Sequence, residues 1–312
     1  MNADISIGSP SVQLPRCAII VVTYNSAGTI RACLERLVGL QDAAVIVVDN
    51  NSADDTKSLL AQQFPLVRVI SLPENVGFGA ACNIGVAAAT APFILLLNPD
   101  VVASPDDLME LVEFLEQRPC AAITGGRLID PSGHPLQSMG DRPSLPGLII
   151  DKPLALLARA AGRKGALRWL LGSASAKYRL PDNPLRVAWV SGAALCCRRE
   201  VWEQLDGFDE GFFMYYEDVD FCIRAGELSL ETWHLPKATF IHRSGTSWHG
   251  KEQLKREAYY HSRCYFFEKH SSPLVLALVR TLEVFYKVTR GYRWFSREVV
   301  GPAQHGQSTG LQ

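Results

Sequence analysis

The chain predicts an α/β fold in which a Rossmann-like mixed sheet is flanked by helices. Three observations support this prediction. Short apolar runs alternate with helical segments of about ten residues, as in right-handed βαβ units. The apolar runs end abruptly in polar residues, so the polar loops should gather along one edge of the sheet. The 312 residues, 47% of them hydrophobic, are enough to form a large core.

In the first half of the chain, three apolar runs predict buried strands, because they lack the alternation of a half-exposed strand. They cover residues 17–22, 45–48 and 93–97, and a further strand is expected at 67–72. Helices are expected at 27–37 and 80–89. Ser52, followed by Asp55, resembles a capping box that opens a further helix reaching Leu60.

The second half is less regular. Ser104 is the expected N-cap of a helix at 105–118. Further helices are expected at 200–205 and 219–226, and 154–171 has helical character within a loop-like region at 131–184. The expected strands are 121–123, 127–129, 187–197, 232–235 and 238–241.

Composition excludes several classes of function. A formal net charge of −1 and a pI near 6.7 lack the basic footprint of a nucleic-acid-binding protein. The eight cysteines lie mostly in apolar segments without a C-x-x-C pair, which indicates reduced residues of a cytoplasmic protein. The N-terminus has no signal-peptide pattern. The apolar stretch at 273–279 is too short to span a bilayer.

Asp100 is the first candidate for chemistry. It follows the apolar run 93–97 through Asn98 and Pro99, and Pro99 forces the chain to turn. A carboxylate at the carboxyl end of a core strand lies where open α/β sheets bind ligands, and it requires a cation there. A turn aspartate is the structural alternative. Because Asp49 ends another strand of the same sheet, function is favoured, with a divalent metal carrying a phosphorylated substrate.

Three carboxylates lie close together at Glu217, Asp218 and Asp220. They repel one another unless a cation or a proton is shared. Asp220 is expected to pair with Arg224 on a helix surface, and solvation is an alternative for Glu217. Asp218 occupies an N-cap position, but the aromatic residues before it indicate a walled cleft, which suits a general base.

His242 ends a predicted strand and precedes a turn-rich loop. A lone histidine is usually structural. A neutral imidazole beside a carboxylate, however, is normal metal ligation, so His242 is a candidate ligand.

Eight short motifs follow one another along the chain. They are T-Y-N from Thr23, V-V-D-N-N-S from Val47, E-N-V-G-F-G from Glu74, N-P-D from Asn98, W-V-S-G-A from Trp189, G-F-D-E-G-F-F from Gly207, E-D-V-D from Glu217 and H-x-x-G-x-S from His242. In this order they resemble the family 2 glycosyltransferases of the GT-A fold, particularly the bacterial rhamnosyltransferase-like branch. Each motif is weak alone, and the resemblance covers about residues 17–270.

The resemblance implies a role for each matching residue. The nucleotide site would include Thr23, Tyr24, Asn25, Asp49, Asn75, Gly77, Asn83 and Asn98, with Asp49 bonded to a uracil or thymine ring. Asp100 would hold the metal, helped by His242, and Asp218 would deprotonate the acceptor hydroxyl. The acceptor would be bordered by Trp189, Ser191, Gly192 and Glu217. Arg263 would reach the diphosphate.

One departure concerns the metal. The family's motif is commonly D-x-D, and Asn98 replaces the first aspartate, a variant frequent in the rhamnosyltransferase-like branch. The amide keeps an oxygen ligand but removes a charge. Modest affinity for Mg²⁺ or Mn²⁺, held partly by substrate phosphates, is therefore expected.

The predicted organisation has four parts. A flexible leader at 1–15 precedes a GT-A domain at 16–270, divided into a nucleotide-binding half at 16–103 and an acceptor-binding half at 104–270. An amphipathic helix at 271–300 and a disordered tail at 301–312 follow. The helix either packs on the domain or lies in the plane of a membrane, where about five basic residues would contribute on the order of 5 kcal/mol.

The predicted function is an inverting, metal-dependent glycosyltransferase. Its donor would be a nucleotide sugar, with dTDP-rhamnose as the specific candidate. Its acceptor would be a saccharide or a polyprenyl-diphosphate-linked saccharide at the inner face of the cytoplasmic membrane. The alternatives are a nucleotidyltransferase, whose Gly-rich triphosphate loop is missing at 26–29, and a non-catalytic module that binds nucleotide sugars.

Overall fold

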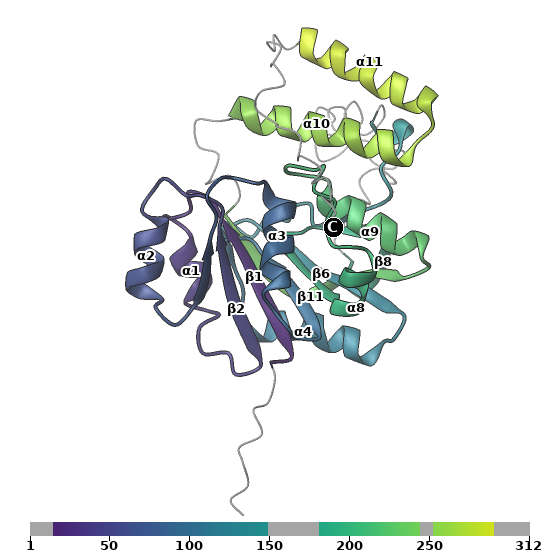
Figure 1. Cartoon of the computed structure of the whole chain (residues 1–312). Coiled ribbons are helices and arrows are strands. Elements are labelled where there is room, and N and C mark those ends of the chain that lie inside the picture. The colour runs from purple at the N-terminus through teal and green to yellow at the C-terminus, as the bar shows by residue number, and fades with distance from the viewer. Residues whose placement is uncertain (1–14, 149–180, 244–251, 290–312) are drawn as a thin grey trace, which may run out of the picture.

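A mixed sheet of nine strands forms the centre of the protein in the computed structural model (Figure 1). The structure describes residues 15–148, 181–243 and 252–289. Strand order is β3-β2-β1-β4-β10-β6-β11-β5, and β8 pairs with β11. The strands are β1 (Cys17–Thr23), β2 (Ala43–Asp49), β3 (Arg68–Ser71), β4 (Phe93–Leu97), β5 (Val101–Val102), β6 (Ala121–Ile129), β8 (Leu185–Val187), β10 (Ala194–Arg198) and β11 (Glu231–His242). The predicted α/β fold is confirmed.

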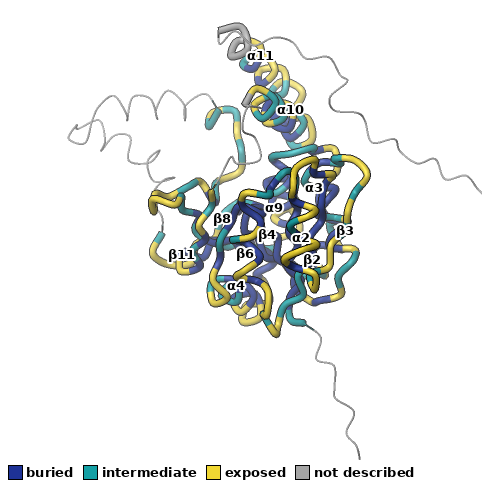
Figure 2. The backbone as a smooth tube through the Cα atoms, turned by 90° about the vertical axis from the view of Figure 1, so that its left-hand side faces the viewer, coloured by how far each residue is buried: buried dark blue, intermediate teal, exposed yellow. Residues whose placement is uncertain are grey.

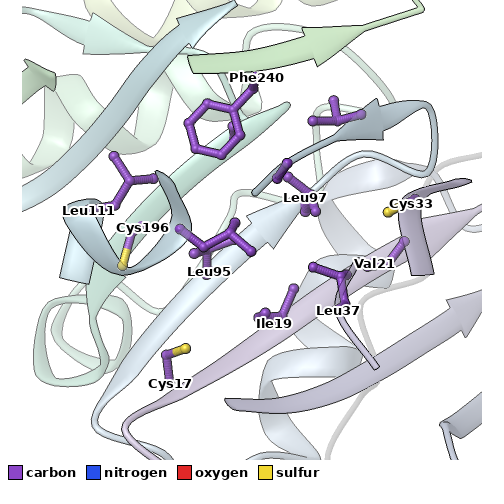
Figure 3. Close-up of a cluster of buried hydrophobic side chains, with 14 of the residues drawn as sticks. Cys17, Ile19, Val21, Cys33, Leu37, Leu95, Leu97, Leu111, Cys196 and Phe240 are labelled. Atoms are coloured by element: carbon purple, nitrogen blue, oxygen red, sulfur yellow. The ribbon is translucent and has the colours of Figure 1, made fainter. Parts of the chain in front are cut away.

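Helices cover both faces of this sheet. One face carries α1 (Ile30–Leu34), α2 (Thr56–Gln63) and α4 (Pro105–Gln117), and the other carries α3 (Phe78–Ala87), α8 (Arg199–Gln204) and α9 (Glu217–Glu227). Alternate residues of β1 therefore enter two different cores. Ile19 and Val21 pack with Leu95 of β4 on one face, whereas Ile20 packs on the other (Figure 3). The tube view shows the buried strands enclosed between helices with exposed outer sides (Figure 2).

Two pairs of predicted strands are each one continuous strand. β6 runs straight through Gly125 and Gly126 because these positions lack a side chain where neighbours come close. A Cβ at Gly125 would lie 2.6 Å from Val190, so glycine here permits close packing rather than ending the strand. β11 likewise continues past Pro236, with a shift of its register against β6 between Leu235 and Thr239.

The predicted strand at 187–197 is instead interrupted. It divides into β8, then β9 (Trp189–Val190), then β10, and β9 pairs with β7 (Met139–Gly140) in a separate two-stranded sheet. Residues 191–193 lie between β9 and β10 and belong to neither strand. Hydropathy alone does not reveal this break, because the whole stretch is apolar.

Helix starts were predicted with mixed success. Ser104 caps α4 as expected, accepting the backbone N–H of Asp107 at 3.1 Å. The capping box at Ser52 is wrong: α2 begins at Thr56, whose N–H donates to Asp54 at 3.0 Å, and the Ser52 hydroxyl accepts from Asn25. The helix expected at 27–37 is shorter, because α1 spans only Ile30–Leu34 and continues as turns.

A helical hairpin of α10 (Glu252–His270) and α11 (Pro273–Thr289) packs against α9 (Figure 1). Sequence reasoning predicted only the second of these helices. The predicted helix at 154–171 and the residues after 289 lie outside the described part of the chain.

Buried ion pairs attach this hairpin to the sheet domain. Asp220 is fully buried on α9 and is met by Arg224 at 2.7 Å, as expected, and by two residues of α10: His270 at 2.7 Å and Lys269 at 2.9 Å. Lys269 also reaches Asp209 at 2.6 Å. A buried carboxylate needs such partners, since removing them would leave an uncompensated charge. Helix α10 therefore fixes both α9 and the loop before it.

Candidate active site

The carboxyl ends of six strands share one edge of the sheet. β3, β2, β1 and β4 are parallel, β10 is antiparallel to both β4 and β6, and β11 is parallel to β6. Thr23, Asp49 and His242 are therefore the last residues of strands that end at the same edge, and Asp100 follows β4 there. Open α/β sheets bind their ligands at this position.

Asp100 and His242 lie together at this edge, although 142 positions separate them in the chain. The His242 Nε2 is 3.1 Å from the Asp100 carboxylate. β5 brings them together, since Val101 is the register partner of His242 and the Arg243 N–H donates to the Asp100 carbonyl at 2.9 Å. Both side chains are largely buried, with exposed fractions of 9% for Asp100 and 15% for His242. Their predicted convergence is confirmed.

This pair fits part of the coordination shell of a hard divalent cation. Within the described ranges, no group of three or more His, Cys, Asp or Glu side chains is arranged to hold a metal. A carboxylate and an imidazole can each supply one ligand to such a cation, beside oxygens of water and substrate. That arrangement is typical of Mg²⁺ or Mn²⁺ bound together with a phosphorylated substrate.

Asp218 lies in the first turn of α9, and two backbone N–H groups bond its carboxylate. Gly192 donates to Oδ2 at 2.7 Å and Val219 donates to Oδ1 at 2.8 Å. Burial raises the pKa of Asp218, and these two hydrogen bonds lower it in part, leaving it above its usual value. A carboxylate with a raised pKa is a stronger base, as general-base catalysis requires.

Residues 191–193 connect Asp218 to the turn that carries Asp100. Gly192 bonds Asp218 on one side of this segment, and the Ala193 carbonyl accepts the Asn98 N–H at 3.0 Å on the other. Asn98 opens the turn that delivers Asp100. The candidate base and the candidate metal ligand therefore stand on either side of the same three residues.

The backbone before Asp218 is strained. Tyr215 and Tyr216 both have φ of 69°, in the left-handed region that bulky residues rarely adopt. Each such residue costs about 1–3 kcal/mol and persists only where its surroundings enforce it. Here the Tyr216 ring packs between Tyr259 and Phe266 of α10, with centroids 5.5 and 5.4 Å away. The docked hairpin thus holds the strained turn that starts α9.

The ends of β1 and β2 contain buried polar atoms without partners in the described part of the chain. Thr23 Oγ1 and Asp49 Oδ1 have no hydrogen bond within the described structure, although the two residues are register partners at the ends of β1 and β2. The other Asp49 oxygen accepts the Ser52 N–H at 3.2 Å and lies 3.4 Å from Lys57. Buried polar groups are rarely left unpaired, so these atoms indicate a ligand with polar groups of its own.

Side-chain amides organise the loops around this position. Asn25, in a left-handed conformation, accepts the N–H groups of Ala53 and Asp54. Asn50 donates to Asn75 at 2.9 Å and to the Gly77 carbonyl at 3.0 Å, and accepts from Val76. Sequence reasoning missed Asn50, although it follows Asp49 in a motif that was already singled out. These bonds hold the loop containing Asn75 and Gly77 beside the end of β2, and its predicted closure over a nucleotide stays a prediction.

Comparisons with known proteins agree with this geometry. The family model described as glycosyl transferase family 2 matches residues 18–168. The N-acetylglucosaminyl-diphospho-decaprenol L-rhamnosyltransferase of Mycobacterium tuberculosis is 30% identical over 268 residues, which cover 81% of this chain and 84% of that protein. The chain belongs to glycosyl transferase family 2.

Two further proteins are similar to this glycosyltransferase. The rhamnosyltransferase WbbL of Escherichia coli K12 is 26% identical over 72% of this chain and 82% of its own. The mannosyltransferase PcManGT from Pyrobaculum calidifontis, solved with GDP-Man and Mn²⁺, aligns with a TM-score of 0.50 at 17% identity, covering 90% of this chain and 83% of that one. The latter likeness concerns the GT-A fold alone.

Two predicted site residues of the glycosyltransferase have other partners. Asn83 exchanges hydrogen bonds with the backbone of Phe208 at 2.9 and 3.0 Å and also donates to Glu210, so it holds the 207–210 loop instead of closing over a nucleotide. Arg263, predicted at the diphosphate, is 2% exposed and pairs with Glu283 of α11 at 3.0 Å. This ion pair joins α10 to α11.

Glu217 is also placed differently from the sequence expectation. It is neither solvated nor open to the surface, with 5% exposure, and its Oε2 has no hydrogen-bond partner within the described residues. Burial, and then the neighbouring Asp218 charge, raise the pKa of Glu217 well above its usual value. Its predicted contact with an acceptor stays a prediction.

The remaining predicted acceptor residues lie within the 191–193 segment or just before it; they are Trp189, Ser191 and Gly192. Trp189 donates from its indole to the Asp141 carbonyl at 3.0 Å, and the Ser191 hydroxyl accepts the Ala193 N–H at 3.3 Å. Gly192 leaves little room: an added Cβ would lie 3.3 Å from Asp218 and 3.5 Å from Phe78. These side chains therefore shape the surroundings of Asp218.

Replacing Gly77 by alanine should disorder the loop that carries Asn75. Gly77 has φ of 90°, and an added Cβ would lie 2.5 Å from the Phe213 carbonyl, which accepts the Phe78 N–H at 2.9 Å. The expected loss of unfolding free energy is roughly 1–3 kcal/mol from strain alone. Gly133→Ala is the matched control, because Gly133 has φ of 80° with nothing within 4 Å.

Denaturant unfolding of both variants tests this expectation. Gly77→Ala should lose more stability than Gly133→Ala, since only the former adds a clash to the backbone strain. Equal losses would show that the contact between Gly77 and Phe213 does not constrain the loop.

Proposed function

We propose that this glycosyltransferase transfers L-rhamnose from dTDP-rhamnose, with inversion, to a polyprenyl-diphosphate-linked saccharide. Two relatives named as rhamnosyltransferases support the sugar, and the name of the M. tuberculosis protein supports a lipid-linked acceptor. One observation supports the assignment of the catalytic residues. Asp218, in the first turn of α9, and the turn from Asn98 to Asp100 are both hydrogen-bonded to the same segment, 191–193.

The nucleotide is expected at the ends of β1 and β2. The unpartnered Thr23 hydroxyl and Asp49 carboxylate oxygen offer a donor and an acceptor for the edge of a pyrimidine ring. Tyr24 and Asn25 follow directly on the loop. From this position the diphosphate would extend along the sheet edge towards Asp100.

Asp100 and His242 would hold a divalent metal, with Asn98 beside them. When bound, Mg²⁺ or Mn²⁺ neutralises the negative charge that develops on the departing diphosphate. The relative solved with Mn²⁺ has the same fold, which agrees with this assignment. Asn98 replaces an aspartate of the common motif, so the diphosphate must supply more of the charge that attracts the metal.

Asp218 would act as the general base. Its carboxylate takes the proton of the acceptor hydroxyl as that oxygen bonds to the anomeric carbon, and the bond from this carbon to the diphosphate oxygen breaks. One displacement from the face opposite the leaving group inverts the anomeric centre. The Gly192 N–H, 2.7 Å from Oδ2, would keep the carboxylate aimed at the hydroxyl.

The hairpin offers a surface for a lipid-linked acceptor. Within the described residues, no helix is long and apolar enough to cross a bilayer. On α11, however, Leu274 is 71% exposed and Leu278 is 44% exposed, one turn apart on the same side. Basic residues follow at Arg280, Lys287 and Arg290. We infer that α11 lies on the inner face of the cytoplasmic membrane, with its buried side held by the ion pair between Glu283 and Arg263.

Asp218→Asn should lower turnover about 10²- to 10⁴-fold, because the amide cannot accept the proton. The affinity for dTDP-rhamnose should stay unchanged, since Asp218 lies on the acceptor side. Transfer to a synthetic polyprenyl-diphosphate N-acetylglucosamine and calorimetry with the donor measure the two quantities. In the wild type, the rate should fall as the pH drops through the raised pKa of Asp218, because the base becomes protonated.

Asp130→Asn serves as the control for the base, because Asp130 is a half-buried carboxylate that accepts the Ser132 N–H in a turn away from Asp218. Near-normal turnover of Asp218→Asn would remove Asp218 as the base. Donor binding by the wild type without any transfer would instead favour a non-catalytic binding module.

Asp100→Ala should abolish the part of dTDP affinity that depends on Mn²⁺, because His242 alone cannot retain the metal. Calorimetric titration of dTDP with and without Mn²⁺ measures this difference, and Asp130→Ala is again the control. If Mn²⁺ strengthens dTDP binding equally in Asp100→Ala and in the wild type, Asp100 is not the ligand.

The double variant Leu274→Glu/Leu278→Glu should lose binding to vesicles of phosphatidylglycerol and phosphatidylcholine. Both side chains are exposed, so the folded hairpin should persist while its apolar face becomes charged. Leu66→Glu changes an equally apolar side chain, 94% exposed, on the sheet domain, and should float with vesicles as the wild type does. Unchanged flotation of the double variant would show that α11 is not the membrane contact.

A further inference from the structure

The segment that bonds Asp218 is the continuation of a small two-stranded sheet. In this β7–β9 sheet, Met139 pairs with Val190 and Gly140 pairs with Trp189. Residue 191 follows β9 directly, and its N–H donates to the Ser138 carbonyl at 2.9 Å. The position of the β7–β9 sheet therefore determines where the Gly192 N–H points.

The β7–β9 sheet is attached to the main sheet at adjacent residues. Val190 packs closely over Gly125 of β6, where a Cβ would lie 2.6 Å away. The register partner of Gly125 on β11 is His234, and its Nε2 is 3.2 Å from the Ser138 hydroxyl. His234 is fully buried and Ser138 is 2% exposed. The β7–β9 sheet is therefore held on the main sheet by the apolar contact of Val190 with Gly125 and by the polar contact of Ser138 with His234.

His234 is uncharged at physiological pH. Burial, and then the positive charge of Arg127, lower its pKa to about 4. In either neutral tautomer, Nε2 can bond the Ser138 hydroxyl, because a hydroxyl both donates and accepts. A hydrogen bond with the Gly126 backbone raises the pKa of His234 in part. The imidazole therefore has polar neighbours both in Ser138 and in β6.

We propose that His234 is a positioning residue for the general base, acting through Ser138. Its imidazole holds Ser138, the Ser138 carbonyl holds the Ser191 N–H, and the next N–H along the chain, that of Gly192, bonds Asp218. This inference rests on the proposed role of Asp218. His234 lies 16 positions beyond Asp218 in the chain and is buried within the sheet, away from the proposed donor and acceptor sites.

Loss of the His234 contact should alter the ionisation of Asp218. The Gly192 N–H lowers the pKa of Asp218, so a displaced Gly192 should raise it. The ionisable groups facing Asp218 are Glu217 on the same helix, Cys82 of α3 and Cys222 further along α9. Arg127 faces His234 from β6. None of these is changed by the variants below.

The test compares His234→Phe and Ser138→Ala with the wild-type enzyme by two measurements. In ¹⁵N-labelled protein, the pH at which the Gly192 amide signal titrates should move upward in both variants. Turnover with dTDP-rhamnose should fall about tenfold, since a small misplacement of a catalytic group has effects of this size, while the calorimetric affinity for dTDP should stay unchanged. His234→Gln, whose amide can reach Ser138, should restore the titration midpoint in part.

Thr124→Val is the matched control. It removes a buried hydroxyl from β6 that donates to the Leu111 carbonyl and has no link to Ser138, so it should destabilise the fold without moving the Gly192 titration. An unchanged midpoint in folded Ser138→Ala and His234→Phe, or an equal shift in Thr124→Val, would overturn the inference. A shifted midpoint together with no sugar transfer by the wild type would support the inference and contradict the proposed function.

Discussion

The hydrogen bonds of residues 191–193 are the constraint on which the candidate site depends. Gly192 donates to Asp218 and Ala193 accepts from Asn98, so one short segment fixes the candidate base and the turn of the candidate metal ligand relative to each other. These residues leave the sheet ladder to make those bonds. The break between β9 and β10 is therefore part of the site's construction, and the buried contacts beneath it have functional consequences.

Two other parts of the structure hold Asp218 from its opposite side. The left-handed Tyr215 and Tyr216 store strain that the aromatic side chains of α10 must balance. The fully buried Asp220, only two residues beyond the base, pairs with Lys269 and His270 of the same helix. The hairpin is consequently required for the geometry of α9, and a contact of α11 with a membrane would act on the element that carries the base.

The sequence predicted the parts of the site that depend on strand ends. Asp100 follows β4 and His242 ends β11, so both lie at the carboxyl edge of the sheet. Asp220 pairs with Arg224 because they are four apart on a helix. The sequence did not predict the contacts between elements that are distant in the chain. The pairing of Arg263 with Glu283, and of Asn83 with Phe208, depends on how helices and loops dock, which local periodicity does not encode. The sequence also did not predict the break between β9 and β10. There the Gly192 N–H donates to the side chain of Asp218, 26 residues away, instead of to a neighbouring strand.

A crystal structure of the Asp218→Asn enzyme with dTDP-rhamnose and Mn²⁺ tests the central claim most directly. We expect an anomalous manganese peak beside Asp100 and His242, with the anomeric carbon facing residue 218 across the 191–193 segment. Manganese bound elsewhere, or a sugar directed away from residue 218, would contradict the assignment of metal site and base to one cleft.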